Sequence, residues 1–184
     1  MYQIHEVVAW SFDSADYAGE ALTRRSNTGY LIYIKMSPIL LWHSKKQGTV
    51  ETSVFGAEFV AMKAATEAAR GLRYKLRMMG IEVDEPNYIY GDNMSVIHNT
   101  QRPESTLKKK SVAICYHFMR ESVAMGESLT THIRSELNPA DICTKVIAGG
   151  AKRDKLTDQI LYFASNVSVA ATKSVKKVKF EQDK

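Results

Sequence analysis

Acidic side chains next to predicted strand ends and helix starts are the residues of this sequence best suited to chemistry. Asp13 and Asp16 follow a predicted first strand, Glu58 lies in the first turns of a long predicted helix, Asp92 ends a later strand, and Asp141 begins the last predicted helix. Clustered carboxylates repel one another and raise one another's pKa values, so they need cations as neighbours. Oxygen ligands select Mg²⁺ or Mn²⁺, and two such ions can activate a water for attack on a phosphodiester.

Each of these acidic positions also has an ordinary structural explanation. Acidic residues at element ends are commonly helix caps or solvated turn residues. Asp92 and Asn93 are compatible with an Asx turn before a helix, and Glu58 with a favourable interaction with the helix dipole. The chemical interpretation therefore depends on the whole ordered set of carboxylates converging on one site.

The hydrophobic pattern predicts the elements that would bring the carboxylates together. Apolar and β-branched runs predict strands over residues 7–12, 29–35, 39–42, 87–90 and 129–133. A stripe of apolar residues at three- and four-residue steps predicts a long helix between an N-cap at Ser53 and a stop at Gly80. Further helices are expected over residues 94–99 and 111–125 and after Pro139.

The order of these elements predicts an α/β fold. Three strands in an antiparallel meander, followed by alternating helices and strands, imply a mixed sheet with helices packed on it. Residues 1–164 are expected to form this domain, and residues 165–184, rich in Lys, Val, Ser and Ala, a basic and flexible tail.

Composition excludes several classes of protein. With 45% hydrophobic and 24% charged residues in 184, the chain fits one globular domain. No apolar run approaches the ~20 residues of a membrane-spanning helix, and the N-terminus lacks the features of a signal peptide. The two cysteines, Cys115 and Cys143, are interpreted as reduced thiols of an intracellular protein, cytoplasmic or nuclear. The net charge of +5 permits a polyanionic partner without establishing one.

Six segments, in order and spacing, resemble the ribonuclease H domain of Ty1/copia-type retrotransposon Pol polyproteins. They are Asp16–Tyr30 (DYAGE followed by RRSNTGY), Pro38–Gln47, Ala57–Ala61 (AEFVA), Asp92–Ser95 (DNMS), Tyr116–Glu121 (YHFMRE) and Ala140–Lys145 (ADICTK). The likeness spans roughly residues 7 to 146. It implies an RNase H-like fold, with a five-stranded mixed sheet and helices on both faces, that cleaves the RNA strand of an RNA–DNA hybrid with two Mg²⁺ or Mn²⁺ ions.

The resemblance also implies which residues hold the two ions and perform catalysis. Three of the family's four acidic ligands fall on Glu58, Asp92 and Asp141, but the first falls on Ser14. Because a shift of one residue turns a strand side chain to the opposite face, Asp13 is expected to reach the site only through a β-bulge. We keep Asp13 as the first ligand and Asp16 as its substitute. The alternative is a catalytically inactive copy that still binds nucleic acid.

The resemblance and the basic clusters together predict the partners. Arg24, Arg25 and the run Lys108, Lys109 and Lys110 are candidates for contacts with the phosphates of an RNA–DNA hybrid. An upstream reverse transcriptase domain of the same polyprotein is a second expected partner, the chain being a fragment of that polyprotein, and virus-like particles are a possible location. An integrase-like enzyme would share the carboxylates but not the quoted segments.

The aromatic and histidine residues outside these segments are given structural roles. Trp10 and Trp42 lie on predicted strands and are expected in the core, in preference to a base-stacking surface. His117 and His132 are interpreted as structural residues.

Overall fold

The structure is a computed structural model that describes residues 9–19, 22–34, 39–107 and 110–161. Its centre is a five-stranded sheet in the order β3-β2-β1-β4-β5. The strands are β1 (Ala9–Asp16), β2 (Asn27–Ile34), β3 (Leu41–Lys46), β4 (Asn87–Gly91) and β5 (Ser128–His132). The first three strands pair antiparallel, whereas β4 runs parallel to β1 and β5 parallel to β4. The mixed sheet predicted from the element order is therefore confirmed.

The long helix α1 (Val54–Met78) packs against the sheet through its apolar stripe. It begins where the side chain of Ser53 accepts the N–H of Gly56, and the chain leaves it at Gly80, which has a positive φ of 76°. Phe59 and Met62 of α1 are buried against β4 and two further helices, α2 (Met94–Gln101) and α3 (Ala113–Ala124). This core includes Ile89 of β4 and therefore joins α1, α2 and α3 to the sheet.

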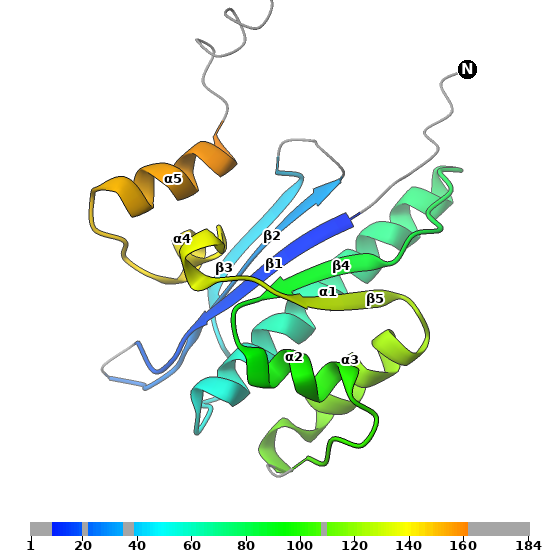
Figure 1. The fold of residues 1–184 in the computed structure, drawn as a ribbon, viewed down its shortest axis with the longest axis horizontal. Coiled ribbons are helices and arrows are strands. Elements are labelled where there is room, and N and C mark those ends of the chain that lie inside the picture. The colour runs from blue at the N-terminus through cyan, green and yellow to red at the C-terminus, as the bar shows by residue number, and fades with distance from the viewer. Residues whose placement is uncertain (1–8, 20–21, 35–38, 108–109, 162–184) are drawn as a thin grey trace, which may run out of the picture.

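Helices cover both faces of the sheet (Figure 1). α1 crosses behind the strands, and the one-turn helix α4 (Asp141–Thr144) lies in front of them, in contact with β1, β2 and β3. Gly29 of β2 permits this close approach, because a Cβ there would lie 2.6 Å from Cys143 Cβ and from Thr144 Cγ2. The chain then continues into α5 (Ala151–Ile160), a helix that the sequence analysis did not anticipate.

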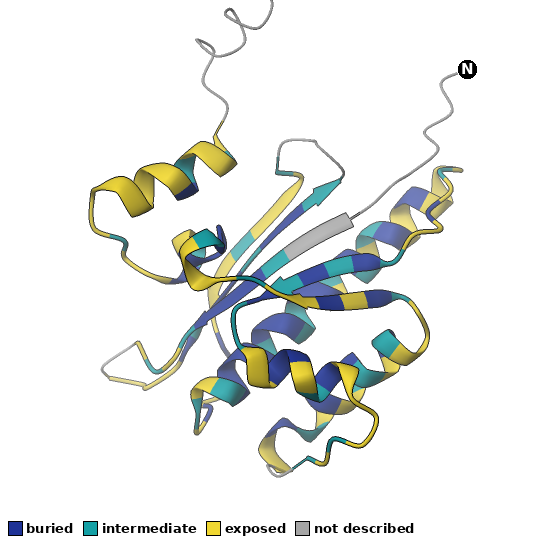
Figure 2. Cartoon of the chain, in the orientation of Figure 1, coloured by how far each residue is buried: buried dark blue, intermediate teal, exposed yellow. Residues whose placement is uncertain are grey.

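Two predicted strands differ from the observed ones. β1 continues through the Asp13–Asp16 segment, which is predicted to follow the strand, because every residue to Asp16 pairs with β2. β3 begins at Leu41 and runs to Lys46 as an exposed edge strand, visible in Figure 2, and not over residues 39–42. Trp42 on this strand is 68% exposed, so the prediction that it belongs to the core is wrong.

Some of the predictions fall outside the described residues. The expected tail at residues 165–184 and the first part of the predicted first strand belong to that group, as does the side chain of Trp10. Among the helices that the structure describes, none combines the length and hydrophobicity needed to span a bilayer.

Candidate active site

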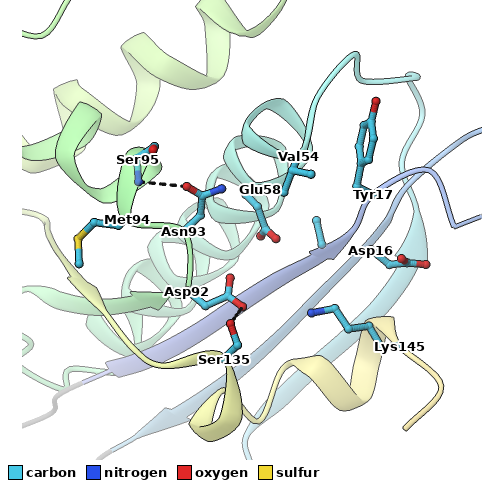
Figure 3. Close-up of a pocket in the computed structure, with 11 residues that line it drawn as sticks. Asp16, Tyr17, Val54, Glu58, Asp92, Asn93, Met94, Ser95, Ser135 and Lys145 are labelled. Carbon is cyan, nitrogen blue, oxygen red and sulfur yellow. Dashed lines mark hydrogen bonds between the residues drawn. The ribbon is translucent and has the colours of Figure 1, made fainter.

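An open cavity of about 430 Å³ lies where β1 and β4 end and α1 begins. Glu58 comes from the second turn of α1, and Asp92 directly follows β4. Figure 3 shows their carboxylates turned toward the same space, with the ammonium group of Lys145 approaching from the segment after α4. The carboxylate of Asp16 points away from the other two (Figure 3). Asp16 nevertheless lines the cavity, and its role as a substitute ligand stays a prediction.

The pairing of β1 with β2 decides which side chains of the first strand reach this site. Asp13 pairs with Tyr30, Ser14 with Gly29 and Ala15 with Thr28, in an unbroken register without a bulge. Ala15 packs with alanines of α1, so Asp13, two residues earlier, is on the same face as α1 and Glu58. The bulge expected to bring Asp13 to the site is therefore absent, and Asp13 is buried on the face of β1 that packs against α1, outside the lining of the cavity.

Ser14 lies on the opposite face of β1, beside Asp141. Its Oγ donates a hydrogen bond of 2.9 Å to Asp141 Oδ1, and both side chains are buried. The resemblance places the first acidic ligand at position 14, where this chain has a serine. The hydroxyl group of that serine contacts Asp141, the fourth candidate ligand. The four candidates Asp13, Glu58, Asp92 and Asp141 are divided between the two faces at the end of β1.

Asp13, Glu58 and Asp92 form the carboxylate group on the α1 side. Asp13 is 1% exposed and its Oδ1 has no hydrogen-bond partner. Burial, and next the charge of Asp92, raise the pKa of Asp13 well above its ordinary value. Burial, followed by the charges of Asp13 and Asp92, raises the pKa of Glu58 to about 9, although Lys145 opposes this shift. These carboxylates lack the positive charge that would keep all of them ionised.

Asp92 is oriented by its neighbours at the end of β4. The adjacent Asn93 caps α2 by accepting the N–H groups of Ser95 and Val96, so Asp92 is not needed as the helix cap and its side chain lines the cavity. Ser135 Oγ donates a 2.7 Å hydrogen bond to Asp92 Oδ2. The Asx-type role considered for this pair thus belongs to Asn93.

The negative charge of Asp141 is offset by two neighbouring lysines. Asp141 is 1% exposed, and besides the hydroxyl of Ser14 it contacts Lys145 Nζ at 2.7 Å and Lys152 Nζ at 3.5 Å. Lys145 follows Asp141 by one helical turn, while Lys152 comes from α5. Sequence reasoning missed both lysines, although the motif that contains Asp141 ends in Lys145.

The candidate ligands differ in how well their surroundings suit a divalent cation. In the described part of the chain, no three His, Cys, Asp or Glu side chains lie close enough, as they stand, to hold a metal ion. Asp13, Glu58 and Asp92 nevertheless offer hard oxygen donors, one of them buried without a partner, which is the donor chemistry that Mg²⁺ or Mn²⁺ prefers. Asp141 does not fit in the same way, because ammonium groups already neutralise it.

The structure describes only some of the basic residues that were predicted to contact nucleic acid. Arg24 and Arg25 are exposed in the connection between β1 and β2, and Lys110 is exposed at the start of the short 3₁₀ helix Lys110–Val112. Lys108 and Lys109 lie outside the described residues. The lining of the cavity includes Tyr17 from the same connection as the two arginines, but neither arginine itself.

Arg120 holds the segment that leads to the basic run. Its guanidinium group donates to the carbonyl oxygens of Ser105, at 2.8 Å, and Pro103, at 2.6 Å, and lies over the ring of Tyr116. The hydroxyl of Tyr116 donates to the same Ser105 carbonyl at 2.5 Å. Both residues belong to the segment Tyr116–Glu121, for which the sequence analysis proposed no role.

We expect Arg120→Met to lower the free energy of unfolding by about 2 kcal/mol, because two carbonyl groups lose a charged donor. Urea denaturation measures this loss. Arg120→Lys, which retains a positive charge but not the forked geometry, should recover part of it. Glu121→Gln at the exposed neighbouring position is the matched control, and an Arg120→Met variant as stable as this control would contradict the assigned contacts.

Comparison with known proteins agrees with this geometry. No family model matches the chain. It is 30% identical over 138 residues to the retrovirus-related Pol polyprotein from transposon RE2 of Arabidopsis thaliana, covering 75% of this chain and 9% of that protein. It is also 30% identical over 159 residues to the corresponding polyprotein from transposon RE1 of the same plant. That match covers 86% of this chain and 10% of the polyprotein. The chain thus spans about a tenth of the length of these relatives.

Solved structures give the fold. The N-terminal RNase H domain of Rv2228c from Mycobacterium tuberculosis, solved as a fusion with maltose-binding protein, superimposes with a TM-score of 0.58 at 12% identity, over 83% of this chain and 96% of that one. LC11-RNase H1, solved in complex with an RNA/DNA hybrid, gives a TM-score of 0.55 at 17% identity, over 75% and 93%. The chain therefore has an RNase H fold. Its sequence is similar to part of the retrovirus-related Pol polyproteins of transposons.

Proposed function

We propose that this chain acts on RNA–DNA hybrids as the RNase H domain of a Ty1/copia-type Pol polyprotein and hydrolyses the RNA strand with a divalent cation. The observation that carries the proposal is the pair of carboxylates, Glu58 and Asp92, that line a cavity beside the ends of β1 and β4, close to the buried Asp13. Carboxylates forced together in this way are typical of a cation-dependent site. The likeness to LC11-RNase H1, which was solved with a hybrid, supports the choice of substrate.

Asp13, Glu58 and Asp92 would hold the cation, which supplies a Lewis acid and lowers the pKa of water when it is bound. Ser135 keeps Asp92 turned into the cavity through its 2.7 Å hydrogen bond. Lys145, beside the same space, offers a positive charge to a phosphate (Figure 3). The exposed Arg24, Arg25 and Lys110 would hold the hybrid backbone through salt-dependent contacts.

The partners and the location follow from the same proposal. A reverse transcriptase domain elsewhere in the polyprotein would supply the hybrid, inside the cell in the cytoplasm or nucleus or within virus-like particles. The hybrid itself would be recognised by its shape and by the 2′-hydroxyl groups of the RNA strand, not by its base sequence.

A second function, hybrid binding without cleavage, is favoured by one specific observation. Ser14 stands where the family has an acidic ligand, and Asp141 is bound to lysines. The fold and the basic surface residues do not require an acidic side chain at position 14. In this alternative the chain binds the hybrid but does not hydrolyse the RNA strand.

Incubation with an end-labelled RNA–DNA hybrid separates the two functions. Cleavage of the RNA strand in Mg²⁺ or Mn²⁺, abolished by EDTA and absent on duplex DNA of the same sequence, is the result expected of the enzyme. A gel shift on the hybrid without any product in either metal would identify the binding module. Absence of both binding and cleavage would contradict the proposed substrate.

A further inference from the structure

A second cavity lies at the opposite end of β4 from the candidate active site. It has a volume of about 210 Å³ and is lined by Arg70, Arg73, Tyr74, Arg77, Asn87 and Glu127. The C-terminal half of α1 supplies the first four of these residues, β4 begins at Asn87, and Glu127 directly precedes β5. Asp92 follows the other end of β4, so the two cavities are separated by the length of that strand (Figure 1). We call this second cavity the arginine pocket.

Three guanidinium groups from one side of α1 gather in the arginine pocket. Arg73 is buried, and both Arg73 and Arg77 donate hydrogen bonds to carbonyl oxygens of residues 83–85. Burial, followed by the positive charge of Arg77, lowers the pKa of Arg73 from its ordinary value. The charges of Glu127 and Asp84 oppose this shift. Cations held this close repel one another, so an anion bound among them would stabilise the group.

Two residues of the pocket lining each have a buried polar atom without a hydrogen-bond partner, Arg70 Nε and Asn87 Oδ1. Arg70 is held in place by Glu127, 2.6 Å from its guanidinium group, and by the ring of Phe118, over which it lies. Asn87 is 1% exposed. Buried polar groups in native proteins are nearly always hydrogen bonded, so these two atoms indicate a bound group. The first atom carries an N–H and the second accepts, so a group that satisfies both has an acceptor and a donor.

We propose that the arginine pocket binds a phosphate that carries a proton, as inorganic phosphate or a phosphate monoester does at slightly acid pH. The guanidinium groups would donate to its unprotonated oxygens, a pairing for which their forked geometry is suited. Its O–H would donate to Asn87 Oδ1, with the carboxylate of Glu127 as a second acceptor in the lining.

This chemistry distinguishes the ligand from other anions. A sulfate ion at this pH, or a phosphodiester of a nucleic-acid backbone, has no O–H and would leave the Asn87 carbonyl unpaired. The pocket is thus assigned to a free or terminal phosphate, apart from the cavity that Glu58 and Asp92 line. The inference does not rest on the proposed function, because it involves neither the acidic residues nor a metal ion.

Calorimetric titration of the whole chain with inorganic phosphate, in EDTA and at constant ionic strength, tests this inference at about pH 6. We expect one site that binds phosphate about 10-fold or more tightly than sulfate, because a site built around a hydrogen bond rejects a ligand that lacks the proton. Arg77→Gln should weaken phosphate binding by about 10-fold, the effect of one charge-assisted hydrogen bond. Lys75→Gln changes an exposed lysine of the same helix outside the pocket, with the same change in net charge, and should bind like the wild type. Asn87→Ala should reduce the affinity for phosphate to that for sulfate.

Competition with glycerol phosphate then identifies the source of the phosphate. Displacement of inorganic phosphate indicates a terminal phosphate ester, and lack of displacement indicates the free ion; both results support the inference. Three results overturn it: no binding of phosphate by the wild type, equal affinities for phosphate and sulfate, or equal affinities of Arg77→Gln and Lys75→Gln for phosphate. Circular dichroism melting confirms that each variant is folded, and the wild-type comparison of phosphate with sulfate decides if Asn87→Ala is not. Cleavage of the hybrid is measured separately, so failure of the proposed function leaves this test unaffected.

Discussion

Asp92→Asn is expected to reduce cleavage of an RNA–DNA hybrid by about 10³-fold or more. Asp92 is the acidic residue of the α1-side group that lines the cavity from β4, and its loss removes a ligand and a full negative charge from the cation. Electrostatic stabilisation by a bound metal contributes several kcal/mol, and about 4 kcal/mol corresponds to about 10³-fold in rate. A single-turnover assay with labelled hybrid measures the loss.

The same substitution should leave hybrid binding intact or slightly stronger, since it removes a negative charge that faces a polyanion. Asp84→Asn changes an exposed carboxylate in the segment before β4 and serves as the matched control. Cleavage by Asp92→Asn at the rate of this control would remove Asp92 from the site and, with it, the proposed mechanism. Loss of hybrid affinity together with cleavage would indicate a structural role for Asp92 instead.

Glu58→Gln is expected to stabilise the metal-free chain by about 2 kcal/mol at pH 8. The pKa of Glu58 is raised to about 9 in the folded chain from an ordinary value of 4.5. Between these values the folded state keeps a proton that the unfolded state releases, so the folded state binds more protons. The stability of the wild type therefore falls as the pH rises from about 4.5 to about 9 and levels off above that range.

Urea denaturation in EDTA at several pH values tests this expectation. The variant should be more stable than the wild type at pH 8 and equal to it near pH 4, with a flatter profile between. Glu67→Gln is the control, because Glu67 is an exposed residue of the same helix that pairs with Lys63 at 2.6 Å. Parallel pH profiles of the wild type and Glu58→Gln would contradict the raised pKa.

The two expected results describe one property of the site. The carboxylates that destabilise the metal-free fold are the ones whose charge a bound cation would neutralise. Glu58→Gln, which should stabilise the fold, should therefore also abolish cation binding. Added Mg²⁺ should stabilise the wild type by mass action and leave Glu58→Gln unchanged. Asp141 is expected to behave differently, because its negative charge is already offset by Lys145 and Lys152.

The residue pattern predicted the order of the strands and of the helices up to α4, but not α5. The stripe that includes Phe59 and Met62 repeats with the period of a helix, and the observed α1 buries that stripe. Three consecutive strands are followed by alternating helices and strands. A mixed sheet covered by helices is the arrangement that buries the apolar faces of all these elements. Glu58, Asp92 and Asp141 could be found for the same reason, since each lies near the end of an element that the pattern located.

Which of these side chains meet depends on how the helices pack on the two faces of the sheet. Asp13 and Ser14 are adjacent in sequence, yet α1 and α4 pack on opposite faces of β1, so one joins Glu58 and the other joins Asp141. The contact of Lys152 with Asp141 depends on where α5 returns, which no local pattern contains. The spacing of apolar residues indicates which face of a strand or helix is buried. Which element packs on that face, and which charged side chains lie there, depends on contacts between segments far apart in the chain.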